Sequence, residues 1–266
     1  MTACPSGASS DRTEMQETAA DKVSNLEIST KVGVAQVVTL HDYVPVQKCN
    51  DWLSQVLANS SELETRFEFI NSYGSSWYLD IEHGVLHYYH ANAAHTNELL
   101  YALPDLIPTL SGVSKYLVAP DGATGLPCRS RSQNLGPYWV DGGVVLMMQG
   151  HEGVVHADYE GLAPYPQKLF DPDTRAYSAV LSLAVAASGG NLKIWQEHQL
   201  ANEEPLLCDQ KVSEVAYKVG TMTIFDSFCY HRILASQLDD DHRFRAVAAM
   251  HFLYLAEPYP HWEYWF

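Results

Sequence analysis

Three short stretches decide the fold of this chain: His156-Ala157-Asp158, then Phe225-Asp226-Ser227-Phe228-Cys229-Tyr230-His231-Arg232-Ile233, and then Arg245 at the head of an apolar run. They supply two imidazoles and a carboxylate, the ligand set that holds a non-haem Fe(II) ion and leaves coordination positions open. A His-x-Asp triplet is weak evidence by itself, because such short patterns also occur by chance. The surrounding segments therefore decide whether the three side chains can meet.

The segment before the first pair is apolar. Residues 143–148 read Gly-Val-Val-Leu-Met-Met and lead into the turn-like residues 149–153, Gln-Gly-His-Glu-Gly. We expect a buried strand, a turn, and then a short strand that carries His156 and Asp158. Residues i and i+2 of a strand project on the same side, so both side chains could reach one ion.

Three more strands are expected downstream. Residues 188–195 read as a glycine turn followed by a strand that ends at Trp195. Residues 219–226 are rich in β-branched and apolar side chains and lead directly to His231. Residues 245–255 form a last, mostly apolar strand with a cation at its start.

In this order the features resemble the 2-oxoglutarate- and Fe(II)-dependent oxygenase family. The matching features are the His-x-Asp pair, the Gly-Gly-x-Leu strand, the Gly…Phe-Asp-Ser…His-Arg-Ile segment and a basic residue after the distal histidine. They extend from about Val140 to Leu255, close to half of the chain. The separations between Asp158, His231 and Arg245 also fit the family pattern.

The resemblance implies a mainly β fold with flanking helices, built on a double-stranded β-helix (jelly roll). It implies that His156, Asp158 and His231 bind Fe(II). It also implies that the co-substrate 2-oxoglutarate chelates this metal while its far carboxylate pairs with Arg245, whose planar fork suits a bidentate contact. Arg243 is an alternative anchor two residues earlier, and Arg245 is favoured because it begins the apolar strand. The implied activity is that of a dioxygenase, which hydroxylates an unactivated C–H bond.

Two other classes stay open. The same iron centre could support desaturation, cyclisation or halogenation, although related halogenases have Gly or Ala in place of Asp158. A non-enzymatic jelly-roll binding protein is the second alternative. A zinc-protease helix is rejected, because His151 and His156 are spaced i, i+5, and that motif needs i, i+4.

Composition narrows the partners. The chain has 266 residues, a formal net charge of −16 and a pI near 5.0, which argues against nucleic acid and against anionic membrane surfaces. We expect a small-molecule substrate, an amino acid or a natural-product intermediate, together with dioxygen. The five cysteines are scattered and form no Cys-x-x-Cys pair, which predicts reduced thiols. The sequence shows no secretory signal and no apolar run of bilayer length, so we expect a cytoplasmic protein.

The remaining segments are assigned more coarsely. Residues 1–30 are expected to form a mobile tail and residues 31–266 a single domain, with a strand at 31–40, a helix from Asp42 or Tyr43 to Leu57, a hairpin at 76–90 and a helical region at 97–117 interrupted at Pro104 and Pro108. The loop-rich segment 120–137 carries three candidate substrate contacts: Arg129, Arg131 and Asn134. The aromatic residues 259–266, among them Trp262, either wall the substrate pocket or form the interface of a homodimer.

Overall fold

The computed structural model describes residues 37–67, 70–76, 86–148, 150, 152–158, 162–169, 171, 173–198 and 212–266. The expected tail at 1–30 lies outside these residues. The protein is mainly β, with a few helices. In its described part, no helix combines the length and apolar composition that crossing a bilayer requires. Three cysteines in this part, Cys49, Cys128 and Cys229, are free thiols.

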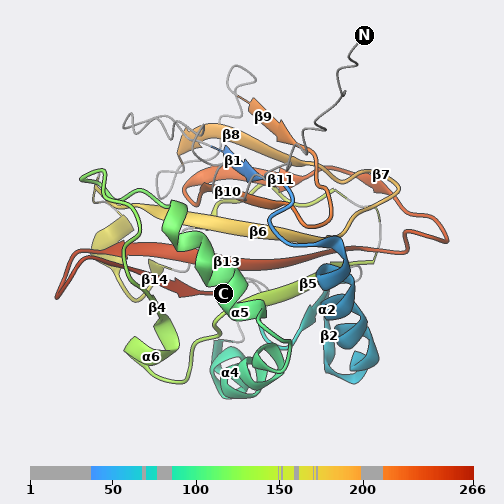
Figure 1. Ribbon diagram of the computed structural model, residues 1–266, viewed down its shortest axis with the longest axis horizontal. Coiled ribbons are helices and arrows are strands. Elements are labelled where there is room, and N and C mark those ends of the chain that lie inside the picture. The colour runs from blue at the N-terminus through green and yellow to red at the C-terminus, as the bar shows by residue number, and fades with distance from the viewer. Residues whose placement is uncertain are drawn as a thin grey trace, which may run out of the picture.

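A large mixed sheet forms the middle of the molecule (Figure 1). Seven of its strands lie in the order β1-β10-β6-β13-β5-β3-β2, and β14 and β4 extend it beside β13. The bounds are β1 Val37–Leu40, β2 Leu63–Phe67, β3 Ile70–Tyr73, β4 Cys128–Ser130, β5 Gly143–Met147, β6 Ala176–Ala184, β10 Met222–Asp226, β13 Arg245–Leu255 and β14 His261–Trp265. The central strands β6 and β13 are almost wholly buried, which explains their near-continuous apolar sequences.

Two smaller sheets accompany the large sheet. One has the order β11-β8-β9, with β8 Leu192–His198, β9 Val212–Val215 and β11 Cys229–Ile233; the other pairs β7 Ser188–Gly189 with β12 Ser236–Gln237. The helices lie on the opposite side of the large sheet from β8, β9 and β11 (Figure 1). The large sheet is thus covered by helices on one face and by strands on the other.

The helices are α2 Val46–Ala58, α4 Leu86–Tyr101, α5 Leu106–Ser111 and α6 Arg131–Leu135, with 3-10 turns η1 Ser60–Glu62, η2 Gly112–Tyr116 and η4 Pro166–Leu169. Helix α2 packs against β6 and buries Cys49, Trp52, Leu53 and Val56, which recur at helical spacing.

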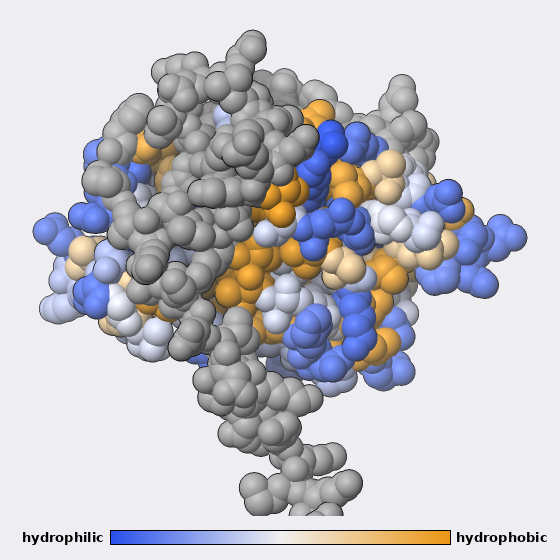
Figure 2. All heavy atoms as spheres, turned by 90° about the horizontal axis from the view of Figure 1, so that it is seen from above, coloured by the Kyte–Doolittle hydropathy of each residue, from blue (hydrophilic) through white to orange (hydrophobic). Residues whose placement is uncertain are grey.

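From above, hydrophobic residues gather near the middle of the visible face and hydrophilic ones at its edges (Figure 2).

The expected hairpin at 76–90 is wrong over 86–90, where α4 begins; residues 77–85 lie outside the described residues. The apparent alternation around Val85, Leu86 and Tyr88 misled the prediction. The buried positions of α4 are Tyr89, Ala93, Thr96 and Leu100, a helical period.

Other boundaries shift less. Helix α2 begins at Val46, after Pro45, and β1 is the described part of the strand expected at 31–40. The helical region at 97–117 is interrupted near Pro104 as expected, but Pro108 lies within α5, close to its start, where a missing N–H is tolerated. The segment 120–137 is less irregular than expected, because it contains β4 and α6.

The aromatic C-terminal residues form β14, which pairs with β13 and β4. Trp262 and Trp265 are fully buried within the chain, and Tyr259 is exposed. No second subunit is needed to cover the two tryptophans, and the homodimer stays a prediction.

Candidate metal centre

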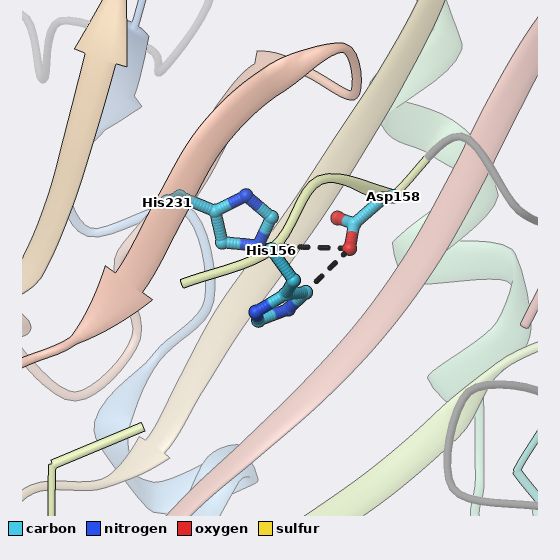
Figure 3. A group of neighbouring side chains, drawn as sticks. All are labelled: His156, Asp158 and His231. Atoms are coloured by element: carbon cyan, nitrogen blue, oxygen red, sulfur yellow. Dashed lines mark ion pairs between the residues drawn. The ribbon is translucent and has the colours of Figure 1, made fainter. Parts of the chain in front are cut away.

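Two segments far apart in the sequence place three potential ligands in one cluster (Figure 3). The Oδ1 atom of Asp158 lies 3.7 Å from Nε2 of His156 and 3.6 Å from Nε2 of His231. One ligand atom from each residue can be chosen so that all lie within 4.8 Å of one another. The family resemblance implied that these three side chains would meet, and they do.

Backbone hydrogen bonds join the two segments. The amide of His156 donates to the carbonyl of His231 at 3.0 Å, and the amide of His231 donates back at 2.8 Å. The amide of Asp158 donates to the carbonyl of Ser227 at 2.8 Å. The first segment therefore forms a single bridge to β11 and not the short strand expected from the sequence, but it still projects both side chains toward one point.

The second ring nitrogen of each histidine faces a carbonyl oxygen. Nδ1 of His231 lies 3.1 Å from the carbonyl of Cys229, and Nδ1 of His156 lies 3.0 Å from that of Val154. A carbonyl can only accept, so Nδ1 carries the proton in both rings. The lone pair then resides on Nε2, the atom that faces Asp158, as a metal ligand requires.

The charge states also suit a metal. Burial lowers the pKa of His231 to about 4, although Asp158 opposes this shift, so the ring is neutral at pH 7. Burial alone would raise the pKa of Asp158, but the nearby imidazoles and the hydrogen bond from Ser178 outweigh it and the pKa is lowered. A neutral imidazole and an ionised carboxylate are the forms that bind metal ions.

Three neighbours of the cluster were not among the predicted site residues: Ser178 on β6, His251 on β13, and Ser227 in the turn between β10 and β11. Oγ of Ser178 donates to Oδ2 of Asp158 at 2.5 Å, and Nδ1 of His251 lies 3.8 Å from the same oxygen. Strand alternation offered one signal that could have identified His251. His251 is an even number of residues from Arg245, so the two side chains lie on the same face of the strand.

Arg245 is buried at the start of β13, and Arg243 is exposed. Nη1 of Arg245 lies 3.1 Å from Sδ of Met147, and the guanidinium carbon of Arg245 lies 4.2 Å from the ring centre of Tyr217. Burial lowers the pKa of Arg245, and its contacts with Tyr217 oppose this shift. Its Nε atom is buried without a hydrogen-bond partner, so the site has capacity for an added acceptor.

The candidate substrate residues have three different surroundings. Arg129 is exposed on β4. Arg131 and Asn134 instead contact Glu263: Nε of Arg131 lies 2.6 Å from Oε1, and Nδ2 of Asn134 donates to Oε2 at 3.1 Å. Trp262 is fully buried in the core. A direct substrate contact stays a prediction for all four residues.

The fold and the cluster together define a candidate mononuclear metal centre on a β-sheet scaffold. No family model matches the sequence. No curated protein matches it either.

Solved structures do show similarity. One is an oxidoreductase of the 2OG-Fe(II) oxygenase family from Burkholderia pseudomallei, with 16% identity and a TM-score of 0.28; the match covers 42% of this chain and 40% of that one, less than half its length. Another is the non-heme alpha ketoglutarate dependent epimerase SnoN from nogalamycin biosynthesis, with 12% identity, a TM-score of 0.48 and coverage of 81% and 76%. A third is a Pseudomonas putida prolyl-4-hydroxylase, with 16% identity, a TM-score of 0.40 and coverage of 88% and 97%.

The family that the sequence motifs resemble is therefore also found among the structural similarities. Because the TM-scores lie below 0.5, these similarities do not define the chemistry of this chain. The residues of the site have to do so.

Proposed function

We propose that the protein is a non-haem Fe(II)- and 2-oxoglutarate-dependent dioxygenase that hydroxylates an unactivated C–H bond of a small molecule. The observation that carries the proposal is the convergence of His156, Asp158 and His231, with both Nε2 atoms facing one carboxylate oxygen. Two neutral imidazoles and one carboxylate are the donor set of a facial triad. The two facing sheets support a double-stranded β-helix as the scaffold.

Arg245 would bind the far carboxylate of 2-oxoglutarate. Its unpartnered Nε offers a donor, and Tyr217 beside it offers a hydroxyl. Strand alternation places two more buried hydroxyls without partners, those of Ser182 and Thr223, on the same face of the large sheet as Arg245. These residues fit an anionic, oxygen-rich co-substrate.

When bound, Fe(II) and 2-oxoglutarate would together supply the oxidising power for dioxygen chemistry, and the protein supplies positions and excludes water. The side chain of His156 is 43% exposed, whereas those of Asp158 and His231 are 7% and 6% exposed. The adjacent Val154 is 68% exposed. We infer that the substrate approaches from the side of His156. We propose that it is a free small molecule, such as an amino acid or a natural-product intermediate, and that the reaction takes place in the cytoplasm.

The direct test is turnover. Protein reconstituted with Fe(II) is expected to convert 2-oxoglutarate to succinate in air. Amino acids from a panel are added one at a time, and the one that is the substrate is expected to increase the rate of succinate formation. Succinate is measured by mass spectrometry, with the His231→Ala variant as control. Succinate formation no faster than in this control, with and without every candidate substrate, would favour the non-enzymatic binding protein.

Arg245→Ala is expected to weaken 2-oxoglutarate binding far more than Arg243→Ala does. Losing one partner of a buried, charge-assisted pair costs about 2–5 kcal/mol, whereas Arg243 is exposed and an exposed charge contributes little. The measurement is an anaerobic titration of 2-oxoglutarate into both Fe(II)-loaded variants. If Arg243→Ala had the larger effect, the anchor would move to Arg243.

The products are expected to contain no chlorine. The carboxylate of Asp158 occupies the ligand position that related halogenases leave to chloride, and it excludes that anion by both size and charge. Product analysis by mass spectrometry in chloride-containing buffer checks this, with Asp158→Gly as the variant that opens the position and should lose hydroxylation. A chlorinated product from unmodified protein would contradict the assignment.

A further inference from the structure

The carboxylate of Asp158 has two oxygens, and they have different surroundings. Oδ1 faces the Nε2 atoms of His156 and His231. Oδ2 faces the large sheet, where it accepts the hydrogen bond of Ser178 at 2.5 Å and lies 3.8 Å from Nδ1 of His251. The oxygen turned toward the imidazoles is therefore not the oxygen that the sheet holds.

The hydroxyl of Ser178 links this carboxylate to two more groups. Its Oγ lies 2.9 Å from Oγ of Ser227 and 3.1 Å from Nδ1 of His251. A hydroxyl has one proton and two lone pairs, and an ionised carboxylate only accepts, so the proton of Ser178 goes to Asp158. Oγ can then accept from both neighbours, and this assigns a proton to Nδ1 of His251. The chain of donors runs from His251 through Ser178 to Asp158.

Packing holds the His251 ring in this orientation. It stacks on Phe266, with centroids 5.8 Å apart and planes 11° apart, and contacts Trp265 at 5.7 Å. The register of β13 against β6 places His251 directly opposite Ser178. A Cβ at position 143 would lie 1.9 Å from the Phe266 ring, so glycine there makes room for the stack.

We propose that Ser178 and His251 are positioning residues for the metal ligand. By holding Oδ2 of Asp158, they present Oδ1 as the single coordinating oxygen. A carboxylate that coordinated through both oxygens would take up a position that the co-substrate needs. The inference rests on the proposed metal-binding function of Asp158 and assigns a residue-level cause to its geometry. Residues that orient ligands in this way typically change metal affinity 10–100-fold when replaced.

Matched variants separate the hydrogen bond from packing. Ser178→Ala removes the donor to Oδ2. His251→Phe keeps an aromatic ring against Phe266 and removes the Nδ1 donor, whereas His251→Asn keeps a donor near Nδ1 and removes the ring. Ser75→Ala is the control, because Ser75 is buried after β3, outside the cluster of potential ligands, and its hydroxyl has no hydrogen-bond partner.

The experiment titrates Co(II) into each purified protein and records its visible absorption bands, with thermal melting of the metal-free proteins to check folding. Ser178→Ala and His251→Phe are expected to weaken Co(II) binding about 10–100-fold and to shift the absorption bands. His251→Asn and Ser75→Ala are expected to stay close to the unmodified protein.

Three outcomes would overturn the inference. If Ser178→Ala and His251→Phe bind Co(II) like the unmodified protein, neither residue positions the ligand. If His251→Asn is impaired as much as His251→Phe, ring packing and not the donor is responsible. If the unmodified protein binds no Co(II), the metal centre itself fails, and the inference fails with it; the first two outcomes leave the proposed function standing.

Discussion

Replacing His231 with alanine is expected to abolish divalent metal binding and turnover. The ring supplies one of the two imidazoles of the cluster, and its Nε2 lies 3.6 Å from Oδ1 of Asp158. A site that loses one of three ligands loses much of its affinity and its geometry. His156→Ala should have the same effect. Anaerobic titration with Fe(II), followed by a succinate assay, measures both properties.

A matched control is available nearby. His242 is exposed and pairs with Asp239 at 2.9 Å, so His242→Ala should leave metal binding and turnover unchanged. Far-ultraviolet circular dichroism of all three variants verifies the fold. Succinate formation at the unmodified rate by His231→Ala would refute the ligand assignment.

Of all the substitutions proposed for this protein, Glu263→Ala is expected to lower the free energy of unfolding the most. Its carboxylate pairs with Arg131 at 2.6 Å, and both side chains are fully buried. Its other oxygen accepts from Asn134 at 3.1 Å and from Tyr165 at 2.9 Å. Removing one partner of a buried pair leaves a charge inside the protein without its counter-ion, which costs about 3–5 kcal/mol. Urea denaturation measures the free energy of unfolding.

The control is an ion pair of similar length on the surface. Lys48 and Asp105 are 2.9 Å apart, and their side chains are 36% and 71% exposed. Lys48→Ala should therefore change the free energy of unfolding by no more than about 1 kcal/mol. The double variant Arg131→Met, Glu263→Leu should be less destabilised than Glu263→Ala, because it leaves no buried charge. Equal losses for Glu263→Ala and Lys48→Ala would contradict the prediction.

The cluster of potential ligands could be predicted because its short motifs follow one another in the order of the family that they resemble. His156 and Asp158 are two residues apart on an extended segment, and His231 follows soon after the β-branched and apolar residues 219–226. The strand at Arg245–Leu255 also has the bounds expected from its sequence. The pair His156 and Asp158 follows the two-residue alternation of an extended segment, and the strand Arg245–Leu255 follows a near-continuous apolar run; both patterns are written in neighbouring residues.

The groups behind the ligands depend on register, which neighbouring residues do not specify. Ser178 meets Asp158 only because β6 lies beside both β10 and β13 in one particular alignment. The partners of Arg131 were missed for the same reason. The loop-rich segment 120–137 suggested that Arg131 contacts the substrate, whereas the guanidinium is buried in an ion pair with Glu263, which is far away in the sequence. Burial of that pair is a property of tertiary structure and cannot be read from composition.

Strand β13 fixes the distance between two residues of the proposed site. Arg245 and His251 lie on the same face of this strand, six residues apart, or roughly 20 Å along it at about 3.3 Å per residue. Deleting one residue between them would shorten that distance and turn one of the two side chains to the helix-covered face. No compensating substitution at either end could restore both. The strand can therefore tolerate changes in the bulk of its side chains much better than a change in their number.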